Sequence, residues 1–370
     1  MTPRSAIVVG AGVMGLAAAW ALARSGARVT ILDQAAIPNP RAASYDDHRL
    51  IRAAYGGRTG YMRLAMEAHG AWEVLQREAG ERLYVPTGLL ALSAPADAWA
   101  RESAAALAAA GAGVRELRPA ELARAFPLLT GDGLATAFLF DEGGVLLAQR
   151  ILLALARLVT AHGGVLRPNC PAVSVDAENG RVALADGGTA EAELVIVAAG
   201  PWTPRLMPSF ARRVTPSRQP VVYLRPPPQA AGRWAAMPMV LEIDPDAGFY
   251  LVPPASGTRL KAGIHRFGGG GDADDSREAT DAEIAAVLDA CRTRLRDFGG
   301  YAVERGAACY YTVERDERFI VEPLGPRGWI MTGFSGHGFK FAALLGLELA
   351  DVLAGKRDAR GFTARAAGRA

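Results

Sequence analysis

The feature that most constrains the fold is the glycine-rich stretch near the start of the chain, residues 6–33, with the sequence AIVVGAGVMGLAAAWALARSGARVTILD. The apolar run Ala6–Val9 predicts a strand. Met14–Arg24 is rich in Ala and Leu and predicts a helix that ends at Ser25-Gly26, and Arg28–Leu32 predicts a second strand. Strand, helix and strand in this order indicate a βαβ unit.

Three glycines, Gly10, Gly12 and Gly15, separate the first strand from the helix at G-x-G-x-x-G spacing. We expect Gly10 to permit a tight turn, Gly12 to let a pyrophosphate approach the backbone, and Gly15 to let the helix pack against the strand. Met14 lies in the helical turn whose free N–H groups would face the phosphates. Asp33, 18 residues after Gly15, is placed to accept a hydrogen bond from a ribose hydroxyl. This predicts a dinucleotide site, disfavours NADP, and leaves NAD and FAD open.

Two simpler explanations exist for this stretch. It could be a glycine-rich turn of an α/β fold without a ligand. It could also be a signal peptide, because Arg4 precedes the apolar run. The signal peptide is excluded because the glycines interrupt the run, and Arg24 and Arg28 follow without a cleavage site.

Composition narrows the class of protein. The chain has 370 residues, half of them hydrophobic, and a net charge of only +3, which gives no reason to expect a nucleic-acid or membrane partner. No apolar run is long enough to cross a membrane. The cysteines Cys170, Cys291 and Cys309 are odd in number and widely spaced, and the five histidines lack metal-ligand spacing. We therefore expect a cytoplasmic protein without disulfides or a metal.

Lysine is unusually rare in this chain. Of 41 basic residues only Lys261, Lys340 and Lys356 are lysines. A lysine retained where arginine is otherwise used suggests a need for a compact ammonium group, although chance survival explains it equally well. Lys356 lies in a polar tail, whereas Lys261 and Lys340 lie among glycines and aromatic residues.

The predicted elements alternate between two kinds along the chain. The apolar strand 192–200 ends in Ala199-Gly200, as expected where a parallel strand meets a cofactor, and this favours FAD; we include Val173, in a predicted hairpin, among the cofactor-binding residues. Residues 240–252 and 259–264 alternate as antiparallel strands do. We therefore predict an α/β fold in which a Rossmann-type FAD-binding domain, residues 1–84, 146–217 and 315–370, is interleaved with an α+β substrate domain built on an antiparallel sheet, residues 85–145 and 218–314.

Three further segments carry expectations. Residues 41–56 are polar, and Arg49 and Arg52 would share a face if the segment were helical, whereas a solvated loop is the simpler expectation. Pro216–Val221 is predicted to cross between the domains. Residues 268–275, GGGGDADD, predict a flexible acidic loop at the surface.

Two late motifs are more specific: residues 308–312, ACYYT, and residues 333–341, GFSGHGFKF. With the first fingerprint they make the chain resemble the monomeric sarcosine oxidase family, from Gly10 to Lys340. That family belongs to the D-amino-acid-oxidase-like flavoproteins and includes N-methyltryptophan, pipecolate and fructosyl-amino-acid oxidases. The resemblance implies an oxidase of secondary amines or amino acids.

The resemblance also implies roles for single residues. Cys309 would carry FAD through a thioether to the 8α carbon of the flavin, whereas Cys170 and Cys291 would be buried structural cysteines. Arg52 and Lys340 would hold a substrate carboxylate. The remaining residues would lie around the flavin and the substrate: Lys261 where oxygen reacts, Arg49 near the flavin, Tyr250, Tyr311 and His265 in the pocket, and the loop of Gly336, His337, Gly338, Phe339 and Lys340 against the cofactor.

The chain departs from the family pattern at a few positions. Family members often carry His-Gly before Asp-x-Arg, whereas this chain has Tyr45-Asp46 before Asp47-His48-Arg49; Leu241 stands where a methionine is expected. These changes affect the expected substrate side chain more than the chemistry.

The expected reaction is hydride transfer from an amine to FAD, followed by transfer of two electrons to O₂ to give H₂O₂. We expect a monomer with a small-molecule amine as its partner. Two alternatives remain: a dehydrogenase of similar fold that passes electrons to a carrier, and a flavin-binding protein without turnover. Lys261 also has a simpler explanation, a structural ion pair with Glu242 or Asp244.

Overall fold

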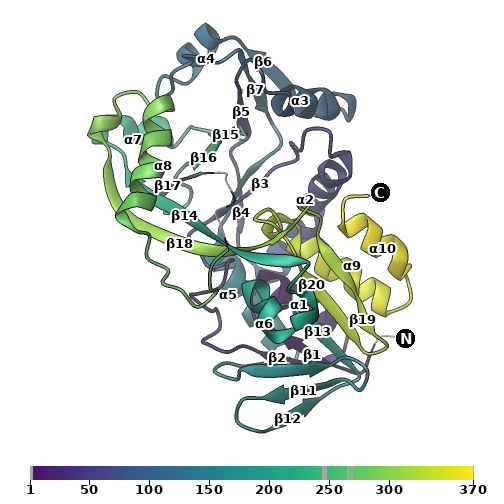
Figure 1. The fold of residues 1–370 in the computed structure, drawn as a ribbon. Coiled ribbons are helices and arrows are strands. Elements are labelled where there is room, and N and C mark those ends of the chain that lie inside the picture. Colours follow the sequence, from purple (N-terminus) through teal and green to yellow (C-terminus); the bar gives the residue numbers. More distant parts are fainter. Residues whose placement is uncertain (1–2, 244–247, 265–266, 268–269, 370) are drawn as a thin grey trace.

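The computed structural model describes residues 3–243, 248–264, 267 and 270–369. Figure 1 shows two regions stacked along the long axis of the molecule, with both chain termini in the lower one. Each region is organised around one large sheet.

The lower region contains a six-stranded sheet in the order β19-β20-β13-β1-β2-β9. Its strands are parallel except for the β19–β20 pair. The bounds are β1 (Ser5–Val9), β2 (Arg28–Leu32), β9 (Val165–Arg167), β13 (Leu194–Val197), β19 (Ile320–Gly325) and β20 (Gly328–Thr332). Strands β1 and β13 lie inside this sheet and are buried along almost their whole length. This explains why both are continuous apolar runs.

The composition of helix α1 (Val13–Arg24) follows from the way it packs. Nearly every residue in it is buried, because it packs against the sheet and against α5 (Ala148–Ala161) and α9 (Ala342–Leu353). A Cβ at Gly346 of α9 would lie 2.6 Å from the carbonyl oxygen of Ala17. Two helices this close accept only small residues, hence the alanines of α1.

The upper region contains an eight-stranded sheet in the order β18-β14-β17-β16-β15-β5-β7-β6. All neighbours in it are antiparallel except the β15–β5 pair. The bounds are β5 (Leu89–Ser93), β6 (Val114–Leu117), β7 (Thr136–Phe140), β14 (Val214–Arg225), β15 (Met239–Glu242), β16 (Phe249–Val252), β17 (Leu260–Ile264) and β18 (Ala302–Glu314). The long β14–β18 ribbon crosses the middle of the molecule and reaches the lower region (Figure 1).

Two small sheets complete the strand framework. One is β10 (Ala172–Asp176), β11 (Arg181–Leu184) and β12 (Thr189–Glu191), and the other is β3 (Arg49–Ile51), β8 (Gly144–Leu146) and β4 (Tyr84–Pro86). The turn between β10 and β11 is the hairpin that Glu178-Asn179-Gly180 predicts. Arg49 begins the short strand β3, which is partly buried, and Arg52 follows it as a buried residue, so this part of the segment is neither a helix nor a solvated loop.

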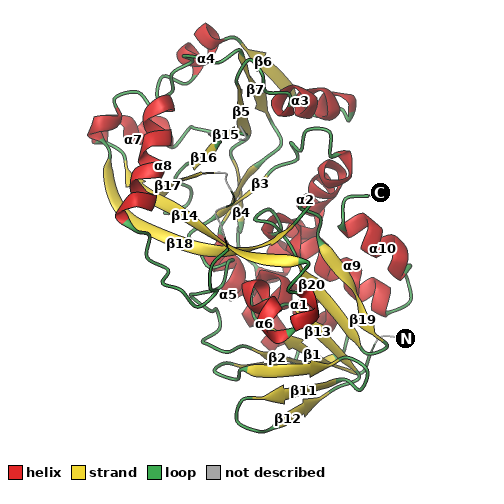
Figure 2. Cartoon of the chain, viewed as in Figure 1, coloured by secondary structure: helices red, strands yellow, loops and turns green. Residues whose placement is uncertain are grey.

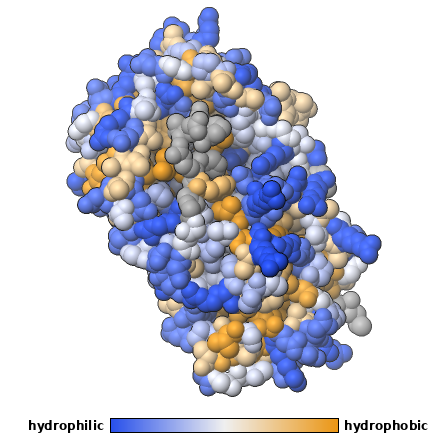
Figure 3. Space-filling model, in the orientation of Figure 1, coloured by the Kyte–Doolittle hydropathy of each residue, from blue (hydrophilic) through white to orange (hydrophobic). Residues whose placement is uncertain are grey.

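The remaining helices surround these sheets (Figure 2). Those of the lower region are α2 (Thr59–Ala79), α6 (Thr203–Leu206) and α10 (Ala359–Ala366); those of the upper region are α3 (Trp99–Ala109), α4 (Pro119–Ala125), α7 (Pro228–Trp234) and α8 (Asp281–Arg294). Short 3₁₀ turns are η1 (Gly200–Trp202), η2 (Pro208–Phe210), η3 (Phe298–Gly300) and η4 (Phe339–Phe341). Polar and apolar residues are interspersed over most of the face in Figure 3, and hydrophobic residues gather toward its lower end.

The predicted fold class is confirmed: a mixed α/β chain with a parallel sheet and a separate, mainly antiparallel sheet. The domain boundaries stay a prediction, although the strands of the two large sheets alternate along the chain as they require. The segment Pro216–Val221, expected to cross between the domains, lies inside β14 and pairs with β18, and the crossover stays a prediction together with the domain boundaries.

Candidate functional site

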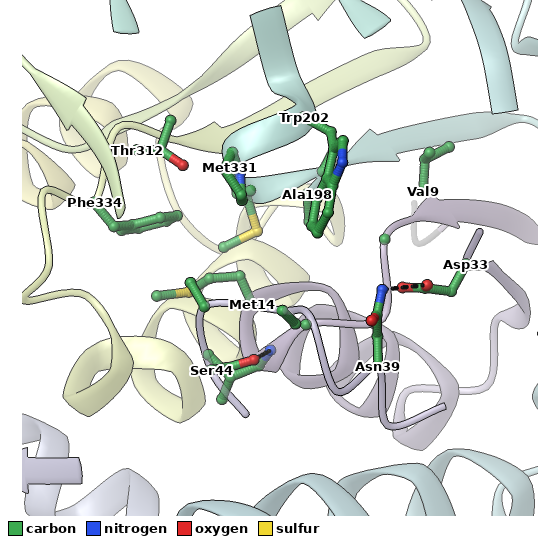
Figure 4. A pocket seen from close by; sticks show the side chains of 18 of the residues that line it. Val9, Met14, Asp33, Asn39, Ser44, Ala198, Trp202, Thr312, Met331 and Phe334 are labelled. Atoms are coloured by element: carbon green, nitrogen blue, oxygen red, sulfur yellow. Dashed lines mark hydrogen bonds between the residues drawn. The ribbon is translucent and has the colours of Figure 1, made fainter. Parts of the chain in front are cut away.

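A cavity of about 340 Å³ opens at the carboxyl end of β1, beside the start of α1. Figure 4 shows Asp33 and Asn39 toward one end and Thr312 and Phe334 toward the other, with Met14, Ala198 and Trp202 between them. The cavity is therefore elongated and runs from the end of the nucleotide-type sheet toward β18. This shape and this position at the strand ends suit a dinucleotide.

The glycine fingerprint has the geometry that its spacing predicts. A Cβ at Gly15 would lie 1.9 Å from the carbonyl oxygen of Gly10, so only glycine allows this approach of helix to turn. At Gly12 the nearest atom to a Cβ is Ser44 Oγ at 3.6 Å, and the residue lines the cavity. Ser44 Oγ also accepts a hydrogen bond from the Val13 N–H at 3.2 Å. Phosphates can thus approach the turn closely, which is what FAD requires.

Asp33 lies at the end of β2 and lines the cavity. Its carboxylate accepts hydrogen bonds from Ala11 N (2.8 Å), Ala35 N (3.0 Å) and Asn39 Nδ2 (3.0 Å). Burial raises the pKa of Asp33, and these three donors oppose that rise. A carboxylate has about four acceptor positions, so one remains for a ribose hydroxyl.

The structure brings most of the sequence-predicted cofactor residues to this one cavity. Those that line it are Gly10, Gly12, Met14, Asp33, Val173, Ala199, Gly200, Gly336, Gly338 and Phe339, together with Arg49 and Tyr311. Those outside its lining are Gly15, Arg52, Tyr250, Lys261, Cys309, His337 and Lys340. His265 lies outside the described residues.

Strand β18 supplies the next part of the site. Cys309 and Tyr311 stand two residues apart, so their side chains point to the same side of the strand, and Tyr311 lines the cavity. Gly336 is needed here, because a Cβ at this residue would lie 2.2 Å from the Tyr311 ring. Cys291 is buried in the core of the upper region, where burial raises its pKa to about 12. Cys170 is buried too, but it lines the cavity.

Tyr250 lies outside the cavity lining but forms a side-chain hydrogen bond with Tyr311, which lines it. Burial raises the pKa of Tyr311 to about 12 and that of Tyr250 well above its ordinary value. Both phenols are therefore neutral at physiological pH. They can donate and accept hydrogen bonds to orient a substrate, but neither can act as a ready base.

Arg52 and Lys340 both pack against Tyr55. Lys340 Nζ donates to the Tyr55 hydroxyl at 3.0 Å and to the His337 carbonyl oxygen at 2.8 Å; the Arg52 guanidinium donates to the carbonyl oxygen of Ala54. Both cations are buried, and neither forms an ion pair with a carboxylate within the described parts of the chain. Burial and the charge of Arg52 lower the pKa of Lys340 well below its ordinary value. An anion placed between them would remove this penalty.

The side chain of His337 points away from the cavity, into an aromatic cluster with Tyr61 and Phe319. Its Nδ1 lies 3.2 Å from the Tyr55 hydroxyl and its Nε2 lies 3.2 Å from the carbonyl oxygen of Glu317. Burial, followed by the charge of Lys340, lowers the pKa of His337 well below its ordinary value, so the ring is neutral. A proton on Nε2 satisfies both contacts, with Tyr55 as the donor to Nδ1.

Lys261 lies on β17 with its ammonium group 2.9 Å from Asp46 Oδ2 and 2.8 Å from the carbonyl oxygen of His48. The sequence suggested Glu242 as an ion-pair partner, and this is wrong: Glu242 forms a two-pronged pair with Arg294, with both N–O distances 2.6 Å. Asp244 lies outside the described residues. Two cations contact the Asp46 carboxylate, because Arg49 donates a hydrogen bond to it as Lys261 does.

Several residues of the site had no individual signal in the sequence. They are Asn39, Ser44 and Asp46 in the polar segment after β2, Trp202 and Arg205 after β13, and Met331 and Phe334 near β20. Two of them lie in segments that the sequence did single out, Trp202 in Gly200-Pro201-Trp202 at the end of an apolar strand and Phe334 in the motif at residues 333–341, but neither was given a role.

Residues 270–275 of the acidic loop are exposed, as predicted, except for the buried Ala273. Asp274 contacts Arg41, Arg205 and Trp202 (Nε1–Oδ1, 2.9 Å). Trp202 and Arg205 line the cavity. Asp274 therefore joins the segment after β2 to the segment after β13.

The described residues contain neither a cluster suited to a metal ion nor a helix suited to cross a membrane. No group of three or more His, Cys, Asp or Glu side chains is placed to hold a metal ion. No helix there is both long and apolar enough to cross a membrane.

Comparison with known proteins agrees with the dinucleotide cavity described above. Residues 5–352 match the family described as DAO, FAD dependent oxidoreductase. The chain is 29% identical over 361 residues to the monomeric sarcosine oxidase of Bacillus sp. (strain B-0618), covering 95% of this chain and 93% of that protein. It is 29% identical over 363 residues to the N-methyl-L-tryptophan oxidase of Yersinia pestis (strain Pestoides F), covering 94% of each.

Solved structures share the fold. NikD, an unusual amino acid oxidase essential for nikkomycin biosynthesis, superposes with a TM-score of 0.82 at 22% identity, over 96% of this chain and 95% of NikD. The L-proline dehydrogenase from P. horikoshii superposes with a TM-score of 0.83 at 19% identity, over 97% and 95%. The shared fold thus includes both an oxidase and a dehydrogenase.

Proposed function

We propose that this chain, which belongs to the FAD-dependent oxidoreductase family, is an oxidase of secondary amines or of N-substituted and cyclic amino acids. Two curated relatives of nearly equal length are named for substrates of this kind. The observation that carries the substrate class is the pair Arg52 and Lys340, two buried cations around Tyr55 without a carboxylate partner among the described residues. Such a pair selects a substrate with a carboxylate.

The overall reaction converts R₂CH–NH–R′, O₂ and H₂O into R₂C=O, R′NH₂ and H₂O₂. When bound, FAD supplies the two-electron chemistry, accepting a hydride equivalent from the amine carbon and passing two electrons to O₂. The amine nitrogen loses a proton, and the resulting imine is hydrolysed by water. This balances all atoms and electrons.

The residues of the chain bind and orient. Gly10, Gly12 and Asp33 would hold the dinucleotide, on the geometry described above. Tyr250 and Tyr311, both neutral, would orient the amine by hydrogen bonds. The Lys261 ammonium would provide a fixed positive charge where oxygen becomes negatively charged.

Covalent attachment of FAD through Cys309 is part of the proposal. Cys309 lies on the same side of β18 as Tyr311, which lines the cavity, and Lys261 and Arg277 lie near enough to it to interact electrostatically. A thiolate is the nucleophile in thioether formation. His337 and Lys340 would hold the cofactor through the backbone of their loop, since Gly336, Gly338 and Phe339 line the cavity.

We also propose that the protein is a cytoplasmic monomer. Its chain would be divided into the two interleaved domains predicted from the sequence. The three cysteines are all free, which suits a reducing compartment.

The second candidate is a dehydrogenase that passes electrons to a carrier. Two observations favour it: the fold is shared with a proline dehydrogenase, and Asp46 lies against the proposed oxygen lysine. The third candidate is a flavin protein without turnover. It does not account for the two buried cations, Arg52 and Lys340.

A panel of N-methyl, cyclic and glycated amino acids, assayed with O₂ or with a redox dye as sole acceptor, separates the three. An oxidase consumes O₂ and yields an equal amount of H₂O₂. Turnover with the dye alone indicates the dehydrogenase, and no turnover with either acceptor indicates the third candidate.

A further inference from the structure

Asp46 is a buried carboxylate that joins two cations. It is 7% exposed and accepts hydrogen bonds from Lys261 Nζ (2.9 Å), from the Tyr223 hydroxyl (2.6 Å) and from the Arg49 guanidinium. Arg49 lines the main cavity, whereas Lys261 lies behind it. Asp46 thus connects the wall of the cavity to a lysine in the interior.

The next acid along the chain has a separate partner. Asp47 pairs with Arg259, with both N–O distances 2.8 Å, and this arginine lies over the Tyr223 ring. The Asp47–Arg259 pair is neutral as a unit. When Lys261 is protonated, the Asp46 cluster, with two cations and one anion, therefore carries one net positive charge at the cavity wall.

Lys261 depends on this arrangement because water cannot solvate it. Its side chain is 2% exposed, and burial followed by the charge of Arg49 lowers its pKa. The carboxylate at 2.9 Å acts in the opposite direction and favours the charged ammonium. Removing Asp46 would leave two buried cations facing each other, and Lys261, unlike arginine, can release its proton.

We propose that Asp46 is a positioning residue for the oxygen half of the reaction, which anchors Lys261 and Arg49 side by side and preserves the positive charge of the cavity wall. This rests on the proposed oxidase function and adds to it a residue that acts through Lys261. The charged or titratable groups around Lys261 are Asp46, Asp47, His48 and Arg49 from the segment leading into β3, Tyr223 from β14, Arg259 before β17, and Cys309 from β18.

The scarcity of lysine makes the charge of Lys261 directly measurable. Protein labelled with ¹³C at lysine Cε gives one signal for each of Lys261, Lys340 and Lys356, and Lys261→Met assigns the first. In the wild type the Lys261 signal should titrate below the ordinary lysine pKa, because burial lowers the pKa of Lys261. In Asp46→Asn it should titrate at a still lower pH, because the carboxylate that favours the ammonium is gone. Tyr223→Phe, which removes a hydrogen bond to Asp46 but no charge, is the control and should leave the titration of Lys261 close to that of the wild type.

Kinetics give the second measurement. In Asp46→Asn, reoxidation of reduced enzyme by O₂ should slow by roughly a hundredfold as the pH rises through the new lysine pKa, and this fall should lie at lower pH than the corresponding fall in the wild type. Anaerobic reduction by the amine should change much less. Tyr223→Phe, which removes a hydrogen bond but no charge, should retain the wild-type pH profile.

The outcomes are distinguishable. If Lys261 titrates at the same pH in Asp46→Asn as in the wild type and reoxidation keeps the wild-type pH profile, Asp46 has only a structural role and the proposal is overturned. If Asp46→Asn does not fold, Asp46→Gly removes the same charge with a smaller residue and is subject to the same test. Failure of any amine to reduce the wild type would instead count against the proposed function, and the lysine titration would still decide whether Asp46 maintains the charge.

Discussion

Arg52 and Lys340 approach the same aromatic ring, that of Tyr55: the Arg52 Cζ lies 4.4 Å and the Lys340 Nζ 5.5 Å from its centroid. The Trp99 ring lies 5.3 Å from the same Arg52 atom. Aromatic faces stabilise these cations without neutralising them, so the pair remains available to an anion.

Replacing Arg52 with Ala should weaken carboxylate substrates and inhibitors. A hydrogen bond to a charged group contributes about 1.5–3 kcal/mol, which corresponds to roughly a tenfold to hundredfold loss in affinity. Inhibition constants of small carboxylates measure this, with Arg63→Ala on the exposed face of α2 as the control. Equal inhibition of the wild type and Arg52→Ala would rule out the clamp.

Cys309→Ser should release the cofactor. If the thioether exists, acid-precipitated wild-type protein stays yellow, whereas the variant loses its colour to the supernatant because oxygen is a poorer nucleophile than a thiolate. Cys291→Ser, in the core of the upper region, is the control and should retain coloured protein. Free FAD in the wild-type supernatant would contradict attachment.

Gly15→Ala should disrupt the cofactor site, because its Cβ would lie 1.9 Å from the backbone oxygen of Gly10. Overpacking of this kind costs about 1–3 kcal/mol of stability, and the flavin content of purified protein should fall. Gly70→Ala on α2 is the matched control, since nothing lies within 4 Å of its Cβ, and it should be neutral or stabilising by about 0.5–1 kcal/mol. Equal flavin content and melting temperature in both variants would count against the close approach.

Acid should destabilise the protein partly through His48. Burial lowers the pKa of His48 from 6.5 to about 3, and Nε2 lies 2.9 Å from the carbonyl oxygen of Arg259. Below pH 6.5 the unfolded chain takes up a proton that the folded chain does not, so the stability is present above that pH and is lost as the pH falls toward 3. At about pH 5 the loss from this group is about 2 kcal/mol.

Denaturant unfolding at neutral pH and at about pH 5 measures this contribution. In His48→Gln the fall in the free energy of unfolding should be smaller than in the wild type. His162→Gln, at the surface beside Glu78, is the control and should retain the wild-type fall. An undiminished fall in His48→Gln would mean that other groups determine the acid sensitivity.

The first βαβ unit could be predicted from sequence because its signals are local. The helix predicted at residues 14–24 is found at Val13–Arg24, and the glycines between strand and helix have the expected contacts. Strand β3 could not be predicted in the same way. It has three residues and obtains its hydrogen bonds from β8, almost a hundred positions later in the chain.

The ion pairs of the site could not be predicted from the sequence either. Asp46 and Lys261 are 215 positions apart, and the sequence suggested Glu242 or Asp244 as the partner. Which acid meets which cation depends on how the segment before β3 packs on β17. A local pattern does not contain that contact, whereas the late motifs are local, and Tyr311, Gly336, Gly338 and Phe339 within them line the cavity.

The most direct test of the account is an anaerobic titration of the purified protein with the best amine from the panel. The account predicts that one equivalent of amine removes the absorbance of the oxidised flavin, that admission of O₂ restores it without a dye, and that one equivalent of H₂O₂ appears. If the amine leaves the spectrum unchanged, the protein is not an amine oxidoreductase. If O₂ fails to restore the colour while a dye does, it is a dehydrogenase and not an oxidase.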